Sequence, residues 1–177
     1  MKTIILSAIS GLIIGALVIW FGAYNVAAND RHFSSTEKFL ELVRNRSISV
    51  RSDDILAPDL EDNKLIKKGA QFYAEMCTGC HLAPGMEQTE LNAGLYPQPP
   101  VFSQSDYKNN SAAQFWIIKN GLKMTGMPAW SPSHTDEQIW TMVAFISKLK
   151  SLSDEQYDEL TQATEEDGEH HDSGHSH

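Results

Sequence analysis

The stretch Cys77-Thr78-Gly79-Cys80-His81 constrains this chain more than any other. A C-x-x-C-H motif indicates covalent haem attachment, because two thiols one helical turn apart can each form a thioether with a porphyrin vinyl group. The histidine that follows is placed to ligate the iron. Cys77 and Cys80 are the only cysteines, and no H-x₃₋₅-H pair occurs outside the extreme C-terminus, which disfavours a zinc site. A dithiol or disulfide role is the remaining alternative.

The N-terminus carries a long apolar segment. No charged residue occurs from Ile4 to Ala28, and this stretch is long enough to cross a bilayer as a helix. A cleaved signal peptide is the alternative, because Val26-Ala27-Ala28 offers small residues for cleavage. The apolar region of a signal peptide usually has about 7–15 residues, so the greater length here favours a retained anchor. In either case we expect the rest of the chain to be exported.

The negative charge is concentrated at the C-terminus. Nine of the 23 acidic residues follow Lys150, where no Lys or Arg occurs, and the other 14 match the 14 basic residues of the chain. The formal net charge of −9 therefore belongs to the C-terminal tail. No basic patch with interleaved aromatic residues occurs, so we expect no nucleic-acid partner.

Composition and pattern divide the chain into four parts. After the apolar segment, several Lys and Arg residues accompany Phe39, Leu40, Leu42 and Val43 at helical spacing, which predicts a basic juxtamembrane helix. Ser153 to Leu160 can form one more short acidic helix, whereas Thr161 to His177 is polar and poor in apolar side chains, which predicts a disordered tail. The expected parts are a transmembrane anchor at 1–28, the basic helix and a linker at 29–59, a haem domain at 60–150 and an acidic His-rich tail at 151–177.

The haem domain is predicted to be all-α. Apolar residues recur every three or four positions before Cys77, and again in Phe115–Ile118 and Ile139–Leu149. Ser111 is expected to cap the second of these helices, and Thr135 with Gln138 forms a capping box for the third. Leu82 to Tyr107 lacks periodicity and is rich in Pro and Gly. Such a long loop needs something to organise it, which a bound haem would supply.

The sixth iron ligand is expected to be a methionine, because a thioether there raises the reduction potential of an electron carrier. The candidates are Met76, Met86, Met124, Met127 and Met142. Met76 and Met142 lie within helix patterns and are expected in the core, while Met86 is too close to His81 to reach the opposite haem face. In the remaining loop, Gly126 allows close approach of the backbone and Pro128 fixes the chain, which favours Met127 over Met124.

With these residues in view, about half of the chain, from Leu60 to Leu149, resembles a class I cytochrome c. The motifs that carry the resemblance are Cys77-x-x-Cys80-His81, Asn120-Gly121, Thr125-Gly126-Met127-Pro128-Ala129-Trp130 and a closing helix with Phe145 near its end. In that family the histidine of the first motif is the proximal iron ligand and the methionine of the G-M-P turn is the distal one. The resemblance therefore implies one covalently bound haem c, with Cys77 and Cys80 as thioethers and His81 and Met127 on the iron.

The resemblance also implies two packing features. The first and last helices of the family cross at a glycine among aromatic residues, and Gly69, Tyr73 and Phe145 match these positions. A proline carbonyl typically accepts the proton of the proximal imidazole's other nitrogen. The candidates for this role are Pro84, Pro97, Pro99 and Pro100.

The function implied is electron transfer rather than catalysis, because protein side chains fill both axial positions. We expect a single-pass, membrane-anchored cytochrome c of a bacterial inner membrane, with its haem domain in the periplasm, carrying single electrons between respiratory partners. The expected partners, besides the membrane, are a terminal oxidase, a quinol–cytochrome c reductase or a small copper protein.

Other functions stay open. The chain can instead be the haem c subunit of a larger membrane oxidoreductase complex, or a haem-based ligand sensor if Met127 dissociates from the iron. The four histidines of the tail, with neighbouring carboxylates, can bind copper, zinc or nickel weakly, although a solvated tail is the simpler interpretation.

Overall fold

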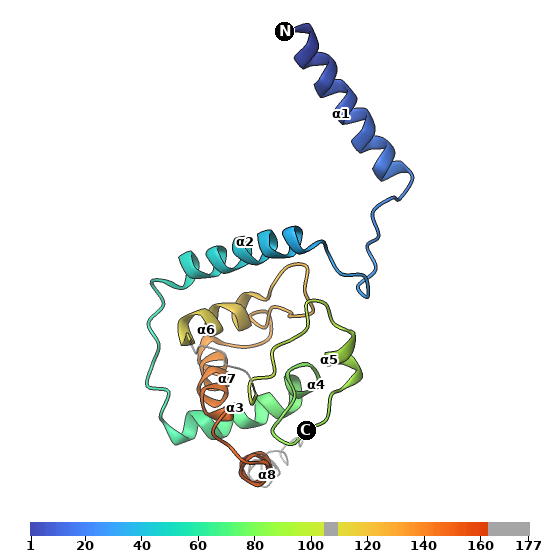
Figure 1. The fold of residues 1–177 in the computed structure, drawn as a ribbon. Helices are drawn as coiled ribbons and strands as arrows, with labels where there is room; N and C mark the ends of the chain where they lie inside the picture. Colours follow the sequence, from blue (N-terminus) through green and yellow to red (C-terminus); the bar gives the residue numbers. More distant parts are fainter. Residues whose placement is uncertain (105–109, 163–177) are drawn as a thin grey trace, which may run out of the picture. The chain divides into compact units, whose positions relative to one another are not determined.

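The computed structural model describes residues 1–104 and 110–162. All regular structure in these residues is helical, which confirms the predicted all-α class (Figure 1). The chain divides into two compact units, Met1–Phe33 and a larger one that begins at Ser34, and each is described by itself. The four histidines of the tail lie outside the described residues.

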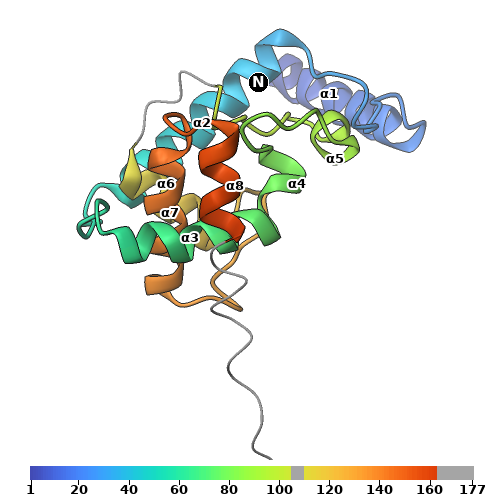
Figure 2. The same ribbon diagram turned by 90° about the horizontal axis from the view of Figure 1, so that it is seen from below.

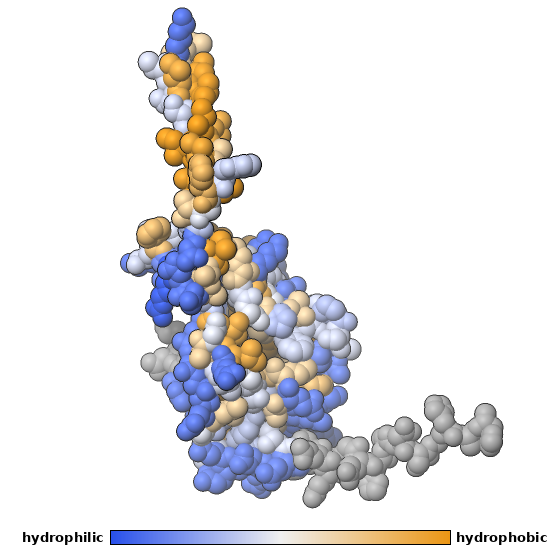
Figure 3. All heavy atoms as spheres, turned by 90° about the vertical axis from the view of Figure 1, so that its right-hand side faces the viewer, coloured by the Kyte–Doolittle hydropathy of each residue, from blue (hydrophilic) through white to orange (hydrophobic). Residues whose placement is uncertain are grey.

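The first unit is built on α1 (Lys2–Trp20), a helix with no buried residue and a mean hydropathy of 2.3. Figure 3 shows the apolar surface that it presents. At 1.5 Å per residue it extends about 28 Å, close to the roughly 30 Å of a bilayer's hydrocarbon core. Among the described residues it is the one helix whose length and composition suit a membrane span, and a signal sequence would share both properties.

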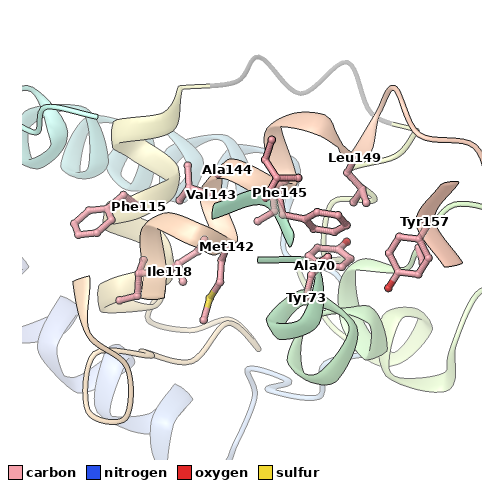
Figure 4. Close-up of a cluster of buried hydrophobic side chains, with 14 residues drawn as sticks. Ala70, Tyr73, Phe115, Ile118, Met142, Val143, Ala144, Phe145, Leu149 and Tyr157 are labelled. Atoms are coloured by element: carbon pink, nitrogen blue, oxygen red, sulfur yellow. The ribbon is translucent and has the colours of Figure 1, made fainter. Parts of the chain in front are cut away.

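The core of the second unit is the crossing of α3 (Asn63–Met76) with α7 (Asp136–Leu149). Gly69 lies at the crossing, and a Cβ there would be 2.0 Å from the carbonyl oxygen of Thr141. The fully buried rings of Tyr73 and Phe145 pack beside it with their centroids 5.4 Å apart (Figure 4). The predicted glycine crossing with its aromatic neighbours is thus confirmed.

Local capping explains where these helices begin. The Asp62 side chain accepts a hydrogen bond from the Lys64 amide at the start of α3. The predicted capping box of Thr135 and Gln138 is present at the start of α7. The prediction for α6 (Ser111–Asn120) was wrong by one residue, because the side chain of Asn110, and not that of Ser111, accepts from the Ala113 amide.

The segment after His81 is more ordered than the sequence suggested. It follows the short α4 (Thr78–His81) and contains α5 (Glu90–Gly94). Asn92 is buried, donates to the Cys80 carbonyl at 2.7 Å and accepts from the amides of Gln88 and Gln98. A bound group is therefore not the only source of order in this loop, because a buried asparagine also fixes it.

Two further helices lie against this core. The predicted basic helix is α2 (Ser34–Ser52), which packs on α6 and buries Ile48. The second is α8 (Asp154–Gln162), which packs on α3 (Figure 2). The ring of Tyr157 in α8 is buried with its centroid 6.1 Å from that of Phe145. Helix α8 is the short acidic helix allowed at Ser153–Leu160, and it belongs to the folded body.

Candidate haem site

A cavity of about 490 Å³ lies within the second unit, and all four residues singled out from the sequence line it: Cys77, Cys80, His81 and Met127. Residues from α2, α3, α6, α7 and the loops complete its wall. Most of these are apolar or proline side chains: Ile48, Met76, Leu95, Pro97, Pro99, Pro100, Phe102, Ile117, Ile118, Leu122, Pro128, Trp130 and Ile146. The cavity therefore combines a large apolar wall with two thiols, an imidazole and a thioether.

The His81 imidazole has a fixed orientation. Its Nδ1 atom lies 2.8 Å from the carbonyl oxygen of Pro100, and its ring stacks on Phe102 with a centroid distance of 4.6 Å. Because a carbonyl can only accept, Nδ1 carries the proton and Nε2 keeps its lone pair. The structure thereby selects Pro100 from the four candidate prolines and leaves Nε2 as the nitrogen able to bind a metal.

Burial lowers the pKa of the His81 imidazole below its usual value, and the bond to the Pro100 carbonyl opposes this shift. The neutral form, which is the form that binds metals, is therefore favoured near neutral pH.

The Cys77 thiol is poorly suited to redox exchange. Burial, and then the neighbouring Cys80, raise the pKa of Cys77 to about 12. Since the thiolate is the nucleophile in thiol–disulfide exchange, a thiol that stays protonated at neutral pH makes Cys77 a poor attacking group.

Met127 is held by a compact turn. The Thr125 hydroxyl accepts from the Met127 amide at 3.1 Å and donates to the Leu122 carbonyl at 2.8 Å. The Leu122 amide in turn donates to the Met127 carbonyl at 3.1 Å. Gly121, which precedes this turn, has a φ of +67°, and a Cβ there would meet the backbone of Pro128 and Ala129.

The other methionines lie elsewhere, with one exception. Met124 is 77% exposed and Met142 is buried in the core, while Met86 is 40% exposed. Met76 also lines the cavity, at the end of α3 next to Cys77. The two methionines of the loop are thus separated as the backbone argument predicted, with Met127 at the cavity and Met124 at the surface.

The family comparison decides what this arrangement is. Residues 64–146 match the family model described as cytochrome C oxidase, cbb3-type, subunit III. This region is a class I cytochrome c domain. Such a domain implies haem binding and haem-based electron transfer. No curated protein matches the chain.

Part of the cavity wall lies outside the region that matches the family model. Arg44, Asn45 and Ile48 of α2 line the cavity, although α2 ends before the cytochrome c domain begins. The sequence predicted a basic juxtamembrane helix here and did not identify these three residues as part of a site. The pattern of α2 alone gives no signal for them, because their position depends on how α2 packs against α6.

Proposed function

We propose that the cavity binds one haem c, with thioethers from Cys77 and Cys80 and with His81 and Met127 as the axial iron ligands. The observation that carries the proposal is that all four residues line one cavity whose imidazole already has Nδ1 engaged by the Pro100 carbonyl. The residues fit the group, because a porphyrin needs an extended apolar wall and its iron needs a neutral imidazole and a soft sulfur.

The haem would supply one-electron chemistry between the ferric and ferrous states. The chain would keep the ligand geometry nearly constant, since the Pro100 carbonyl fixes the imidazole and the turn from Leu122 to Met127 fixes the thioether. If His81 and Met127 both held the iron, they would leave no position open to a substrate. The protein is accordingly proposed to be an electron carrier and not itself an enzyme.

We further propose that α1 anchors the protein in a bacterial inner membrane, with the haem domain in the periplasm. A tether of this kind confines the carrier beside its respiratory partners and raises its local concentration there. The proposed partners are a terminal oxidase, a quinol–cytochrome c reductase or a small copper protein.

A second candidate function is favoured by the matched family, whose description names a subunit of an oxidase. In that case the chain would be the haem c subunit of a membrane oxidoreductase complex, and α1 would pack on another subunit. Purification of the full chain in mild detergent separates the two functions. A free carrier elutes alone, whereas a subunit elutes with its catalytic partner.

The haem assignment is tested with the optical spectrum of the purified protein. Acidified organic solvent should fail to extract the pigment, because thioethers hold it to the chain. Met127→Leu should abolish the weak long-wavelength band of sulfur-ligated ferric haem, and the matched control Met124→Leu should leave it intact. Extractable pigment, or an unchanged band in Met127→Leu, would contradict the proposal.

Two further measurements test the iron ligation and the membrane anchor. Carbon monoxide should bind slowly or not at all to the ferrous protein, whereas prompt binding would favour the ligand sensor. The mass of the mature protein should include residues 1–28 if α1 is an anchor. A mature N-terminus just after Ala28 would instead identify a signal peptide.

A further inference from the structure

One buried polar side chain in the cavity wall has no partner. Gln114 of α6 is 3% exposed, and neither its amide nitrogen nor its amide oxygen makes a hydrogen bond within the described residues. A buried amide left unpaired is destabilising, because it has given up its hydrogen bonds to water without replacing them. Since Gln114 lines the cavity, a polar group bound there would remove this cost.

A single permanent charge lies in the same wall. Of the described residues that line the cavity, Arg44 of α2 alone carries one. Its guanidinium is 3.7 Å from the carboxylate of Glu41, which is 56% exposed, so this ion pair is long and solvated. Arg44 therefore remains able to bind a second carboxylate, and the apolar surroundings would strengthen that contact.

We propose that Arg44 and Gln114 together bind a propionate carboxylate of the haem. This inference rests on the proposed function, and it makes α2 part of the haem site although α2 lies outside the matched domain. A guanidinium and an amide N–H both donate to carboxylate oxygens, so the two side chains match one ligand group. Asn45 also lines the cavity, and its Oδ1 atom accepts a long hydrogen bond of 3.4 Å from Arg44 Nε.

The chemistry of the porphyrin agrees with this placement. Its two propionates lie across the ring from its two vinyl groups. The vinyl groups are assigned to Cys77 and Cys80 at α4, so the propionates must point away from α4. Helix α2 packs on α6, and Figure 1 shows it separated from α4. The wall that holds Arg44 and Gln114 is thus on a side of the cavity that the propionates could reach.

A cation at this position has a defined effect on the iron. Ferric haem carries one more positive charge than ferrous haem, so a nearby guanidinium disfavours the ferric state and raises the reduction potential. Loss of that charge should lower the potential. A lysine at the same position should restore much of the effect as a point charge, without the bidentate geometry.

The test compares reduction potentials of full-length holoproteins. Arg44→Gln should lower the potential, Arg44→Lys should lower it less, and Arg46→Gln should leave it unchanged. Arg46 is the matched control, because it is an exposed arginine of the same helix that does not line the cavity. Equal potentials for Arg44→Gln and Arg46→Gln would overturn the inference.

Gln114 is tested by a spectroscopic signature. Gln114→Leu removes the amide at similar volume, and it should shift the propionate bending band in the resonance Raman spectrum of the haem. An unchanged band would remove Gln114 from the site. In each variant an intact sulfur-ligated haem spectrum shows that the proposed function holds even where this inference fails. A parent protein without covalent haem would overturn both.

Discussion

Gly69 of α3 lies directly on the backbone of α7, where a Cβ would approach the Thr141 carbonyl oxygen to 2.0 Å and the Cβ of Phe145 to 2.9 Å. The carbonyl is part of the backbone and the Phe145 Cβ is bonded directly to it, so neither atom can rotate away. The two helices can therefore accept a larger residue only by moving apart. This contact fixes the helix crossing that delivers Cys77 to the cavity.

Gly69→Ala should therefore destabilise the protein although alanine is the better helix former. Overpacking typically costs about 1–3 kcal/mol, and the gain in helix propensity is about 1 kcal/mol or less. We expect a net loss of roughly 1–2 kcal/mol in the free energy of unfolding, measured by urea denaturation. Gly94→Ala is the control, because nothing lies within 4 Å of its added Cβ. Equal stabilities of the two variants would contradict the close approach.

Tyr73→Phe should weaken the chain just after the haem-binding motif. The buried Tyr73 hydroxyl donates to the Leu82 carbonyl at 2.7 Å, and Leu82 has a φ of +59°, a conformation that a leucine rarely adopts. Removal of the donor leaves a buried carbonyl unpaired, so we expect a loss of about 1–3 kcal/mol in the free energy of unfolding. A variant as stable as the parent would show that this bond does not hold the Leu82 conformation.

The stability of the protein should fall at alkaline pH. Burial is the main cause that raises the pKa of Tyr157 from 10.0 to about 12, and burial raises that of Tyr73 as well. Between the two pKa values the unfolded chain has lost protons that the folded chain keeps, so stability decreases as pH rises. The stabilisation that Tyr157 contributes is fully present below its unfolded pKa of 10.0. It is lost as the pH rises toward its folded pKa of about 12.

Denaturation midpoints measured between about pH 8 and pH 12 should show this decline. Tyr157→Phe removes one of the two titrating hydroxyls and should make the decline shallower. A slope identical to that of the parent would mean that Tyr157 titrates normally in the folded protein.

Asn92→Ala should destabilise the protein, because this buried side chain of α5 makes three hydrogen bonds. The Asn92 side chain donates to the Cys80 carbonyl and accepts from Gln88 and Gln98, so its removal breaks three hydrogen bonds and leaves the Cys80 carbonyl without this donor. We expect a loss of about 2–3 kcal/mol in the free energy of unfolding. Asn120→Ala is the matched control, since Asn120 donates one bond to the Trp116 carbonyl and is exposed. Similar losses in both variants would contradict the organising role of Asn92.

These contacts show what the sequence could and could not predict. The capping box at Thr135 and the crossing at Gly69 follow from local patterns and from a family resemblance, and the structure confirms both. The choice of Pro100 could not be predicted, because it depends on the path of a loop that Asn92 fixes through tertiary hydrogen bonds. The same limit applies to Arg44, whose position at the cavity depends on packing between helices.

Gly126 precedes the proposed ligand Met127 and lies close to a cavity-lining leucine. A Cβ at Gly126 would lie 2.4 Å from a methyl group of Leu95, a cavity-lining side chain that can rotate away. The cost in stability should therefore be modest, about 1 kcal/mol. The effect on iron ligation should be larger than the effect on stability. Moving either Leu95 or Met127 to make room for the added Cβ would weaken the contact between the Met127 thioether and the iron. Gly126→Ala should accordingly bind carbon monoxide faster in the ferrous state than the parent, while Gly94→Ala should not. A rate equal to that of the parent would show that the turn from Leu122 to Met127 fixes the ligand independently of Leu95.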